Sequence, residues 1–280
     1  METEKSKIIS VSDINTWLYC ARKLFLIKVC NLKVPQNRNM AIGRIKHSIL
    51  ERFSKNEKEF VSNIKQDAEG IELVFMYEDF IKKIANSVFI DNMPLLDQFL
   101  IDKDDILKKT LRDFAEDIKL RIASIKSALA AGFRAEEIWK NLDSMYISEL
   151  RLESENLGLR GRVDRVQIYK DENAEDSIIP YELKSREDRI FLSDELQLTA
   201  YAMLLEDFYK KQIKKGIVEV GNKRQEIEIT DKNKKEVLKI AEQIRNLSNP
   251  DSQVPPIQSN FNKCRFCEFR EECMKLQDYG

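Results

Sequence analysis

Long apolar stretches are missing from this sequence of 280 residues. No run approaches the roughly 18 apolar residues that a helix needs to cross a bilayer. The N-terminal residues METEKSKIISVSD also lack the basic segment and the apolar segment of a secretory signal. We therefore expect a cytoplasmic protein that does not associate with membranes.

Cysteine and histidine are scarce, with 5 Cys and 1 His. An odd number of cysteines cannot pair completely, and a reducing cytoplasm disfavours disulfides, so metal binding is the better explanation for clustered cysteines. An excess of basic residues is absent as well, because the formal net charge is -1. This excludes a globally basic nucleic-acid binder, so such a partner would have to be held by a local basic patch or through bound cations.

What is present is an ordinary globular composition, with 42% hydrophobic and 34% charged residues, in which the apolar spacing changes along the chain. Helical spacing predicts a first helix over residues 12–30, with Cys20 inside it, and a second over 39–53. The spacing stays mostly helical over 55–141. From about Tyr146, β-branched residues separated by turn signals predict a meander of strands, then a helix, two short strands and another helix.

We therefore expect an α/β fold in which a mixed central sheet is flanked by helices. The chain is expected to divide into N-terminal helices (1–54), a helical insertion (55–145), a core (146–248) and a C-terminal segment (249–280). The insertion is a candidate arch, lid or partner surface, and the sequence does not decide between these.

Charged residues in the predicted strand IIPYELK indicate a catalytic site. Glu182 and Lys184 are two residues apart and therefore project from the same face of a sheet. Asp164, in the preceding strand, would lie beside Glu182 if the two strands pair as a hairpin. Two close carboxylates favour a hard divalent cation such as Mg²⁺ or Mn²⁺. The alternative is a solvated cluster of cross-strand ion pairs, because Glu-x-Lys by itself is a weak signal.

Three polar residues on predicted helices are further candidates. His47 lies off the apolar stripe of its helix, where a lone histidine is more often solvated than bound to a metal. Gln197 and Tyr201 are four residues apart in the helix after the Glu-x-Lys strand, so both face the same way and could reach a substrate or the lysine. A half-buried amphipathic helix with a polar edge would produce the same pattern.

Three cysteines gather near the C-terminus. Cys264, Cys267 and Cys273 form C-x2-C-x5-C, one thiolate short of a four-ligand site. The spacing alone does not separate a four-iron cluster from tetrahedral zinc. Cys30 stands outside this motif, and we expect it to be an ordinary buried thiol.

The order GRIKH, GRVD, PYELK, QLTAY and C-x2-C-x5-C resembles the RecB-like nucleases of the PD-(D/E)xK (restriction-endonuclease-like) class. It most resembles the CRISPR-associated RecB-like exonucleases that carry an iron-sulfur cluster. The resemblance covers both ends of the chain and about 146–205, and leaves out the helical insertion. It departs from the family at Ala21, where proline is common, and at Tyr181, where the class name expects Asp.

The resemblance implies a role for each candidate residue. The ligands of the catalytic Mn²⁺ or Mg²⁺ would be His47, Asp164 and Glu182. Lys184 would be the catalytic lysine, and Gln197 and Tyr201 would support the active site and position DNA. The resemblance also implies a 4Fe-4S cluster whose ligands would be Cys20, Cys264, Cys267 and Cys273. Such a cluster would join the two ends of the chain and restrict the unfolded state.

The implied activity is metal-dependent hydrolysis of phosphodiester bonds in single-stranded DNA or overhangs. The enzyme would be an exonuclease that processes prespacers in CRISPR adaptation, together with CRISPR integrase proteins. A RecB-like nuclease of DNA repair or of a mobile element is one alternative, and a non-catalytic DNA-binding assembly subunit is another. Strand polarity and self-association into a homo-oligomer are left open. A candidate patch for the DNA backbone comprises Arg22, Lys23, Lys28, Lys33, Arg38, Arg44 and Lys46.

Overall fold

The computed structural model describes residues 8–134, 136–142, 144–170, 176–184, 189–220, 223–247, 249, 253–257 and 260–276. The chain forms the mixed α/β fold that the sequence predicted. Its helices and strands are, in chain order, β1 (Ile9–Ser10), α1 (Val11–Tyr19), α2 (Ala21–Lys28), α3 (Arg38–Ser62), α4 (Gly70–Asp91), α5 (Met93–Gln98), α6 (Lys103–Ala130), α7 (Glu136–Lys140), β2 (Ser144–Ser154), β3 (Leu159–Lys170), β4 (Asp176–Lys184), α8 (Leu192–Tyr209), β5 (Lys215–Val220), β6 (Lys223–Glu228), α9 (Asp231–Asn246), α10 (Phe261–Arg265) and α11 (Arg270–Lys275).

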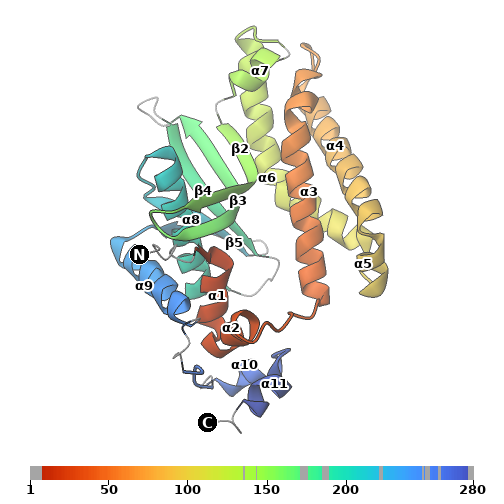
Figure 1. Ribbon diagram of the computed structural model, residues 1–280. Coiled ribbons are helices and arrows are strands. Elements are labelled where there is room, and N and C mark those ends of the chain that lie inside the picture. The colour runs from red at the N-terminus through yellow and green to blue at the C-terminus, as the bar shows by residue number, and fades with distance from the viewer. Residues whose placement is uncertain are drawn as a thin grey trace.

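A mixed six-stranded sheet lies at the centre of the fold (Figure 1). Its order is β1-β3-β4-β5-β6, and β2 pairs with β3 outside this path. The strands β2, β3 and β4 form the predicted antiparallel meander. β4 and β5 are parallel, so α8 connects them as a crossover helix. Among the described residues, no helix is both long and apolar enough to cross a bilayer.

Apolar side chains gather in two separate clusters. One lies between the sheet and α1, α2, α8 and α9, and we call these elements together the sheet unit. The other is formed by α3 to α7, which we call the helical arm. In Figure 1 the long helices of the arm stand side by side along one side of the sheet. The apolar stripe of α3 packs inside the arm through Ile45, Ile49 and Phe53, so this helix belongs to the same cluster as the helices of the insertion.

The first predicted helix is interrupted at Cys20, and the expectation of one continuous helix was wrong. α1 ends at Tyr19 and α2 begins at Ala21, while Cys20 between them has an extended backbone with φ -166° and ψ 112°. α1 also starts earlier than expected, because Ser10 is its N-cap. Helical apolar spacing continues across a break of one residue, so the sequence pattern did not reveal it.

Cys30 is exposed, which corrects the prediction of a buried thiol. It lies beyond the end of α2 at Lys28, and its neighbours Val29 and Asn31 are exposed as well. Asn31 has a left-handed backbone with φ 56°, so the chain turns here. A turn at the end of a helix offers no packed face for the cysteine side chain.

Candidate active site and cysteine site

Ionisable side chains from both units meet where the helical arm contacts the sheet. His47 comes from α3 of the arm, Glu149 from β2 and Asp164 from β3. Nδ1 of His47 lies 2.6 Å from Oε1 of Glu149 and 3.6 Å from Oδ1 of Asp164. One ligand atom of each residue lies within 4.8 Å of the other two, so the group could hold a metal ion. The arm and the sheet unit therefore each supply part of one site.

Glu149 was not singled out from the sequence. It lies within β2, but its backbone is left-handed with φ 58°. A non-glycine residue in this region costs of order 1 kcal/mol or more, and such strain concentrates at functional sites. The side chain is buried, and its Oε2 lies 2.8 Å from Nε of Arg162. The sequence shows only an acidic residue in a strand, because neither the strain nor the nearby His47 has a local signature.

Asp164 and Glu182 lie at the end of the β3–β4 ladder, near one another as the predicted hairpin pairing requires. The last recorded pair is Arg165 with Tyr181, one step before Asp164 and Glu182 in the same register. Oδ2 of Asp164 accepts a hydrogen bond from the N–H of Leu183 at 2.8 Å, which ties this carboxylate to β4.

Lys184 is held by side chains from β4 and α8. Its Nζ lies 2.7 Å from Oε1 of Glu182 and donates to Oε1 of Gln197 at 2.8 Å. Nε2 of Gln197 donates in turn to the hydroxyl oxygen of Tyr201 at 3.2 Å. Asp194, which the sequence did not single out, is buried in the first turn of α8 with Oδ1 3.5 Å from Nζ of Lys184. The structure thus brings the predicted lysine, glutamine and tyrosine into one network.

Burial changes the proton affinity of the acidic groups. Burial, followed by the negative charge of Asp164, raises the pKa of Glu182 to about 8. Burial also raises the pKa of Asp164. Burial by itself lowers the pKa of His47, but the hydrogen bond to Glu149 and the nearby carboxylates outweigh it and the net pKa is raised. Burial likewise lowers the pKa of Lys184, and the charge of Glu182 reverses the effect. Burial therefore favours the protonated form of both carboxyl groups, and the neighbouring charges favour the protonated form of His47 and Lys184.

These features fit a divalent cation. The donors are carboxylate oxygens and an imidazole nitrogen, which suit Mg²⁺ and Mn²⁺ when oxygen predominates. Oε2 of Glu182 is buried without a hydrogen-bond partner among the described residues, as expected for an oxygen that a cation would satisfy. Glu149 belongs to the close group with His47 and Asp164, whereas the sequence indicated Glu182 as the third ligand. The ligand role of Glu182 stays a prediction.

Gly161, the glycine of GRVD, lets α8 approach β3 beside this network. A Cβ at this position would lie 2.7 Å from Cε1 of Tyr201 and 3.0 Å from Cγ2 of Val11. We expect Gly161→Ala to destabilise the fold by about 1–3 kcal/mol, because two buried side chains would have to move. Thermal unfolding measures this. Gly43→Ala is the control, because no atom lies within 4 Å of a Cβ there. Equal unfolding temperatures of the two variants would contradict the assigned contact.

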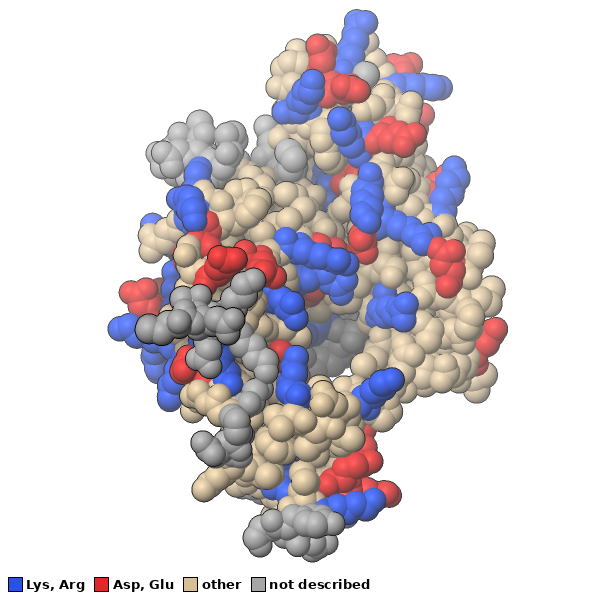
Figure 2. Space-filling view, in the orientation of Figure 1, with Lys and Arg blue, Asp and Glu red and all other residues tan. Residues whose placement is uncertain are grey.

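A cleft of about 780 Å³ runs between the helical arm and the sheet unit and includes His47 and Lys184 in its lining. Figure 2 shows Lys and Arg side chains on both sides of the hollow between the two units. Besides Lys184 and Arg165, the basic residues that line the cleft are Arg38, Lys46, Lys109, Arg112, Lys223 and Arg224. They outnumber the acidic lining residues Asp105, Asp113, Asp117 and Glu219, so the cleft is suited to a phosphate backbone.

The basic patch predicted ahead of His47 is available only in part. Arg22 is buried and is therefore not a surface residue. Lys23 pairs with Glu268 at 2.8 Å, so its charge is partly used inside the protein. Arg38 and Lys46 line the cleft, where Lys46 pairs with Asp113 at 2.9 Å.

The four cysteines proposed as cluster ligands line one pocket between α2 and the C-terminal helices. They are Cys20, Cys264, Cys267 and Cys273. The buried guanidinium of Arg22 donates to the carbonyl oxygen of Pro255 at 2.9 Å and to that of Cys273 at 3.1 Å. Nζ of Lys263 donates to the carbonyl oxygen of Tyr19 at 3.1 Å. The two ends of the chain therefore meet around these thiols, as Figure 1 also shows for α2, α10 and α11.

Comparison with known proteins agrees with this architecture. The family model of the PD-(D/E)XK nuclease superfamily matches residues 8–274, and the chain belongs to this superfamily. The chain is similar to a CRISPR-associated exonuclease Cas4/endonuclease Cas1 fusion of Leptospira interrogans, with 31% identity over 149 residues. This match covers 50% of the chain and 26% of the relative, so the chain spans about a quarter of that protein's length.

A solved structure described as that of SSO0001 aligns with 79% of this chain and 91% of its own, at 19% identity and a TM-score of 0.29. That likeness is too low to carry an argument about fold or function. The family match confirms the resemblance to the PD-(D/E)xK superfamily that the motifs indicated.

Proposed function

We propose that this chain is a divalent-metal-dependent exonuclease that hydrolyses phosphodiester bonds of single-stranded DNA or overhangs. The observation that carries the proposal is the group His47, Glu149 and Asp164, of which His47 lines a cleft together with Lys184 and several basic residues. His47 and Asp164 would hold the cation together with one or both of the neighbouring glutamates. A cation bound there would polarise the scissile phosphate and lower the pKa of an attacking water.

The chain's own side chains have separate tasks in this reaction. The ammonium group of Lys184 would stabilise the negative charge that develops on the phosphate, or orient the water. Gln197 and Tyr201 keep Lys184 in place through the hydrogen bonds described above, so the ammonium needs little reorganisation during the reaction. The basic lining of the cleft would hold the sugar-phosphate backbone next to these groups.

Cleavage of end-labelled single- and double-stranded DNA with Mn²⁺ or Mg²⁺ tests this function. Lys184→Met removes the ammonium and keeps the length of the side chain, and we expect its rate to fall by roughly 100- to 1,000-fold. Mn²⁺ binding by the variant should persist, because Lys184 is not a ligand. No cleavage by the wild-type chain, or equal cleavage by the variant, would contradict the proposed activity.

The cysteine pocket is proposed to hold a 4Fe-4S cluster with a structural role. The four cysteines line one pocket where residues from both ends of the chain meet, and this arrangement supports a group held by four thiolates. Four thiolates also suit tetrahedral zinc, so the iron and zinc contents of anaerobically purified protein distinguish the two.

The biological setting proposed is CRISPR adaptation. The similar protein of Leptospira interrogans is named as a fusion of a Cas4 exonuclease with a Cas1 endonuclease. We infer that this chain trims prespacer ends for a Cas1-type integrase, acting in the cytoplasm. Incubating overhang-bearing DNA with the chain and the integrase of the same genome should yield trimmed and integrated products. Trimming without any effect on integration would favour the alternative of a repair or mobile-element nuclease.

A further inference from the structure

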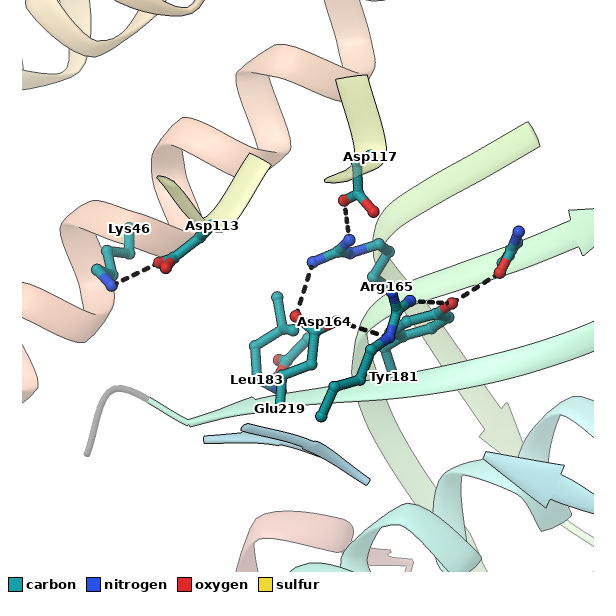
Figure 3. Close-up of polar contacts among 10 residues, drawn as sticks. Lys46, Asp113, Asp117, Asp164, Arg165, Tyr181, Leu183 and Glu219 are labelled. Carbon is teal, nitrogen blue, oxygen red and sulfur yellow. Dashed lines mark hydrogen bonds and ion pairs between the residues drawn. The ribbon is translucent and has the colours of Figure 1, made fainter. Parts of the chain in front are cut away.

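A buried ion pair joins the helical arm to the sheet unit. Arg165 of β3 is 4% exposed, and its guanidinium pairs with the buried carboxylate of Asp117 in α6. Figure 3 shows Asp117 pointing toward Arg165 from the arm. Nη2 of Arg165 lies 3.4 Å from Oε2 of Glu219 in β5. The guanidinium carbon also lies 5.1 Å from the ring centroid of Tyr181, so the charge is enclosed by partners from both units.

This pair adjoins the candidate metal group in sequence and in space. Arg165 directly follows Asp164 in β3. Asp117 and Arg165 line the same cleft as His47 and Lys184. Any contact that fixes Arg165 against α6 therefore also fixes the neighbouring segment of β3 relative to the arm.

The division into two apolar clusters gives this contact its importance. His47 belongs to the arm, whereas Glu149 and Asp164 belong to the sheet unit, so the group forms only when the two units are held at one relative position. Apolar packing is non-directional and permits small sliding movements. A buried charge must keep its partner, so an Asp117–Arg165 pair allows one arrangement and opposes others.

We propose that Asp117 and Arg165 form a positioning pair that holds the arm against the sheet so that His47 stays within ligand distance of Asp164. The pair thereby sets the affinity of the site for a divalent cation without contacting the cation. This inference rests on the proposed function, because it takes the group as a metal site.

The chain offers a matched control for this inference. Glu57 of α3 and Arg121 of α6 form a second buried ion pair, with Oε1 2.7 Å from Nη1. Both residues belong to helices of the arm, and Arg121 also lies over the ring of Tyr146 in β2, 4.5 Å from its centroid. Glu57→Gln disturbs a buried pair but keeps Arg121 and the Asp117–Arg165 pair, so the contacts from the arm to the sheet are retained. A loss that arises merely from disturbing a buried pair should appear in both variants.

The test is Mn²⁺ titration of the full chain, purified anaerobically and followed by electron paramagnetic resonance of the free ion. We expect Asp117→Asn to weaken Mn²⁺ binding by roughly 10-fold, as for groups that orient metal ligands. Glu57→Gln should stay within about twofold of wild type. In a His47→Ala background, Asp117→Asn should produce no additional loss, because its effect passes through His47.

Wild-type affinity in Asp117→Asn would overturn the inference, and so would an equal further loss in the His47→Ala background. Failure of the wild-type chain itself to bind Mn²⁺ would instead contradict the proposed function. Should Asp117→Asn not fold, Asp117→Glu keeps the charge and displaces it by one methylene. That variant is then expected to weaken Mn²⁺ binding about threefold, and again only when His47 is present. Unchanged affinity in that variant would overturn the inference as well.

Discussion

Asp164→Asn is expected to lose metal-dependent DNA cleavage almost completely, by at least about 1,000-fold. The substitution removes the negative charge of a buried carboxylate that lies 3.6 Å from His47 in the close ligand group. An amide oxygen can still accept the hydrogen bond from the Leu183 N–H, so the junction of β3 and β4 should remain intact. Initial rates on end-labelled single-stranded DNA, with Mn²⁺ and with Mg²⁺, measure the loss.

Asp113→Asn is the matched control for this experiment. Asp113 lines the same cleft and pairs with Lys46 at 2.9 Å, but it is not a member of the ligand group. Its substitution also removes one carboxylate and should change the rate by less than about threefold, as expected for an exposed ion pair. If Asp113→Asn and Asp164→Asn lose equal activity, the general charge of the cleft matters and the assigned metal site is wrong.

Cys20→Ala is expected to have the largest effect on stability. The proposed cluster joins Cys20 to cysteines near the C-terminus, and a cross-link that closes so long a loop contributes roughly 4–5 kcal/mol by the chain-entropy estimate. At about 2–4 °C per kcal/mol for a chain of this size, the unfolding temperature should fall by roughly 8–20 °C. The iron content of anaerobically purified protein should fall in parallel, because one of four thiolate ligands is missing.

Cys30→Ala serves as the control for that measurement. Cys30 is an exposed thiol that lies outside the pocket lined by the four other cysteines. Its substitution should leave iron content, colour and unfolding temperature unchanged. Full iron content in Cys20→Ala would remove Cys20 from the ligand set. Stoichiometric zinc in colourless wild-type protein would remove the iron cluster from the proposal.

The polar motifs around Lys184 and the C-terminal cysteine motif could be recognised in the sequence, because each depends only on residues that are close together in the chain. Glu182 and Lys184 share a face of β4 through the period of a strand, and Gln197 and Tyr201 share a face of α8 through the period of a helix. The hydrogen bonds around Lys184 then require only that β4 and α8, which are consecutive elements of the chain, pack against each other. The spacing of Cys264, Cys267 and Cys273 likewise depended only on the sequence of one segment.

Predictions failed where a residue's environment depended on distant parts of the chain or on a single backbone torsion. Cys20 lies between two helices, because one extended residue separates stretches with the same apolar spacing. Cys30 is exposed, since the chain turns at the end of α2. Arg22 belongs to no surface patch, because the C-terminal segment folds back over it.

Local sequence patterns were enough to predict the superfamily, the strands and helices that carry its polar motifs, and candidate site residues such as Asp164 and Glu182. Tertiary packing brings Glu149 to His47 and Asp164, and it brings Asp117 to Arg165 between the arm and the sheet unit. No local pattern predicts these contacts, because secondary-structure periodicity is local, whereas both groups form across an interface between two apolar clusters. Which faces meet there depends on packing and charge pairing between segments far apart in the chain.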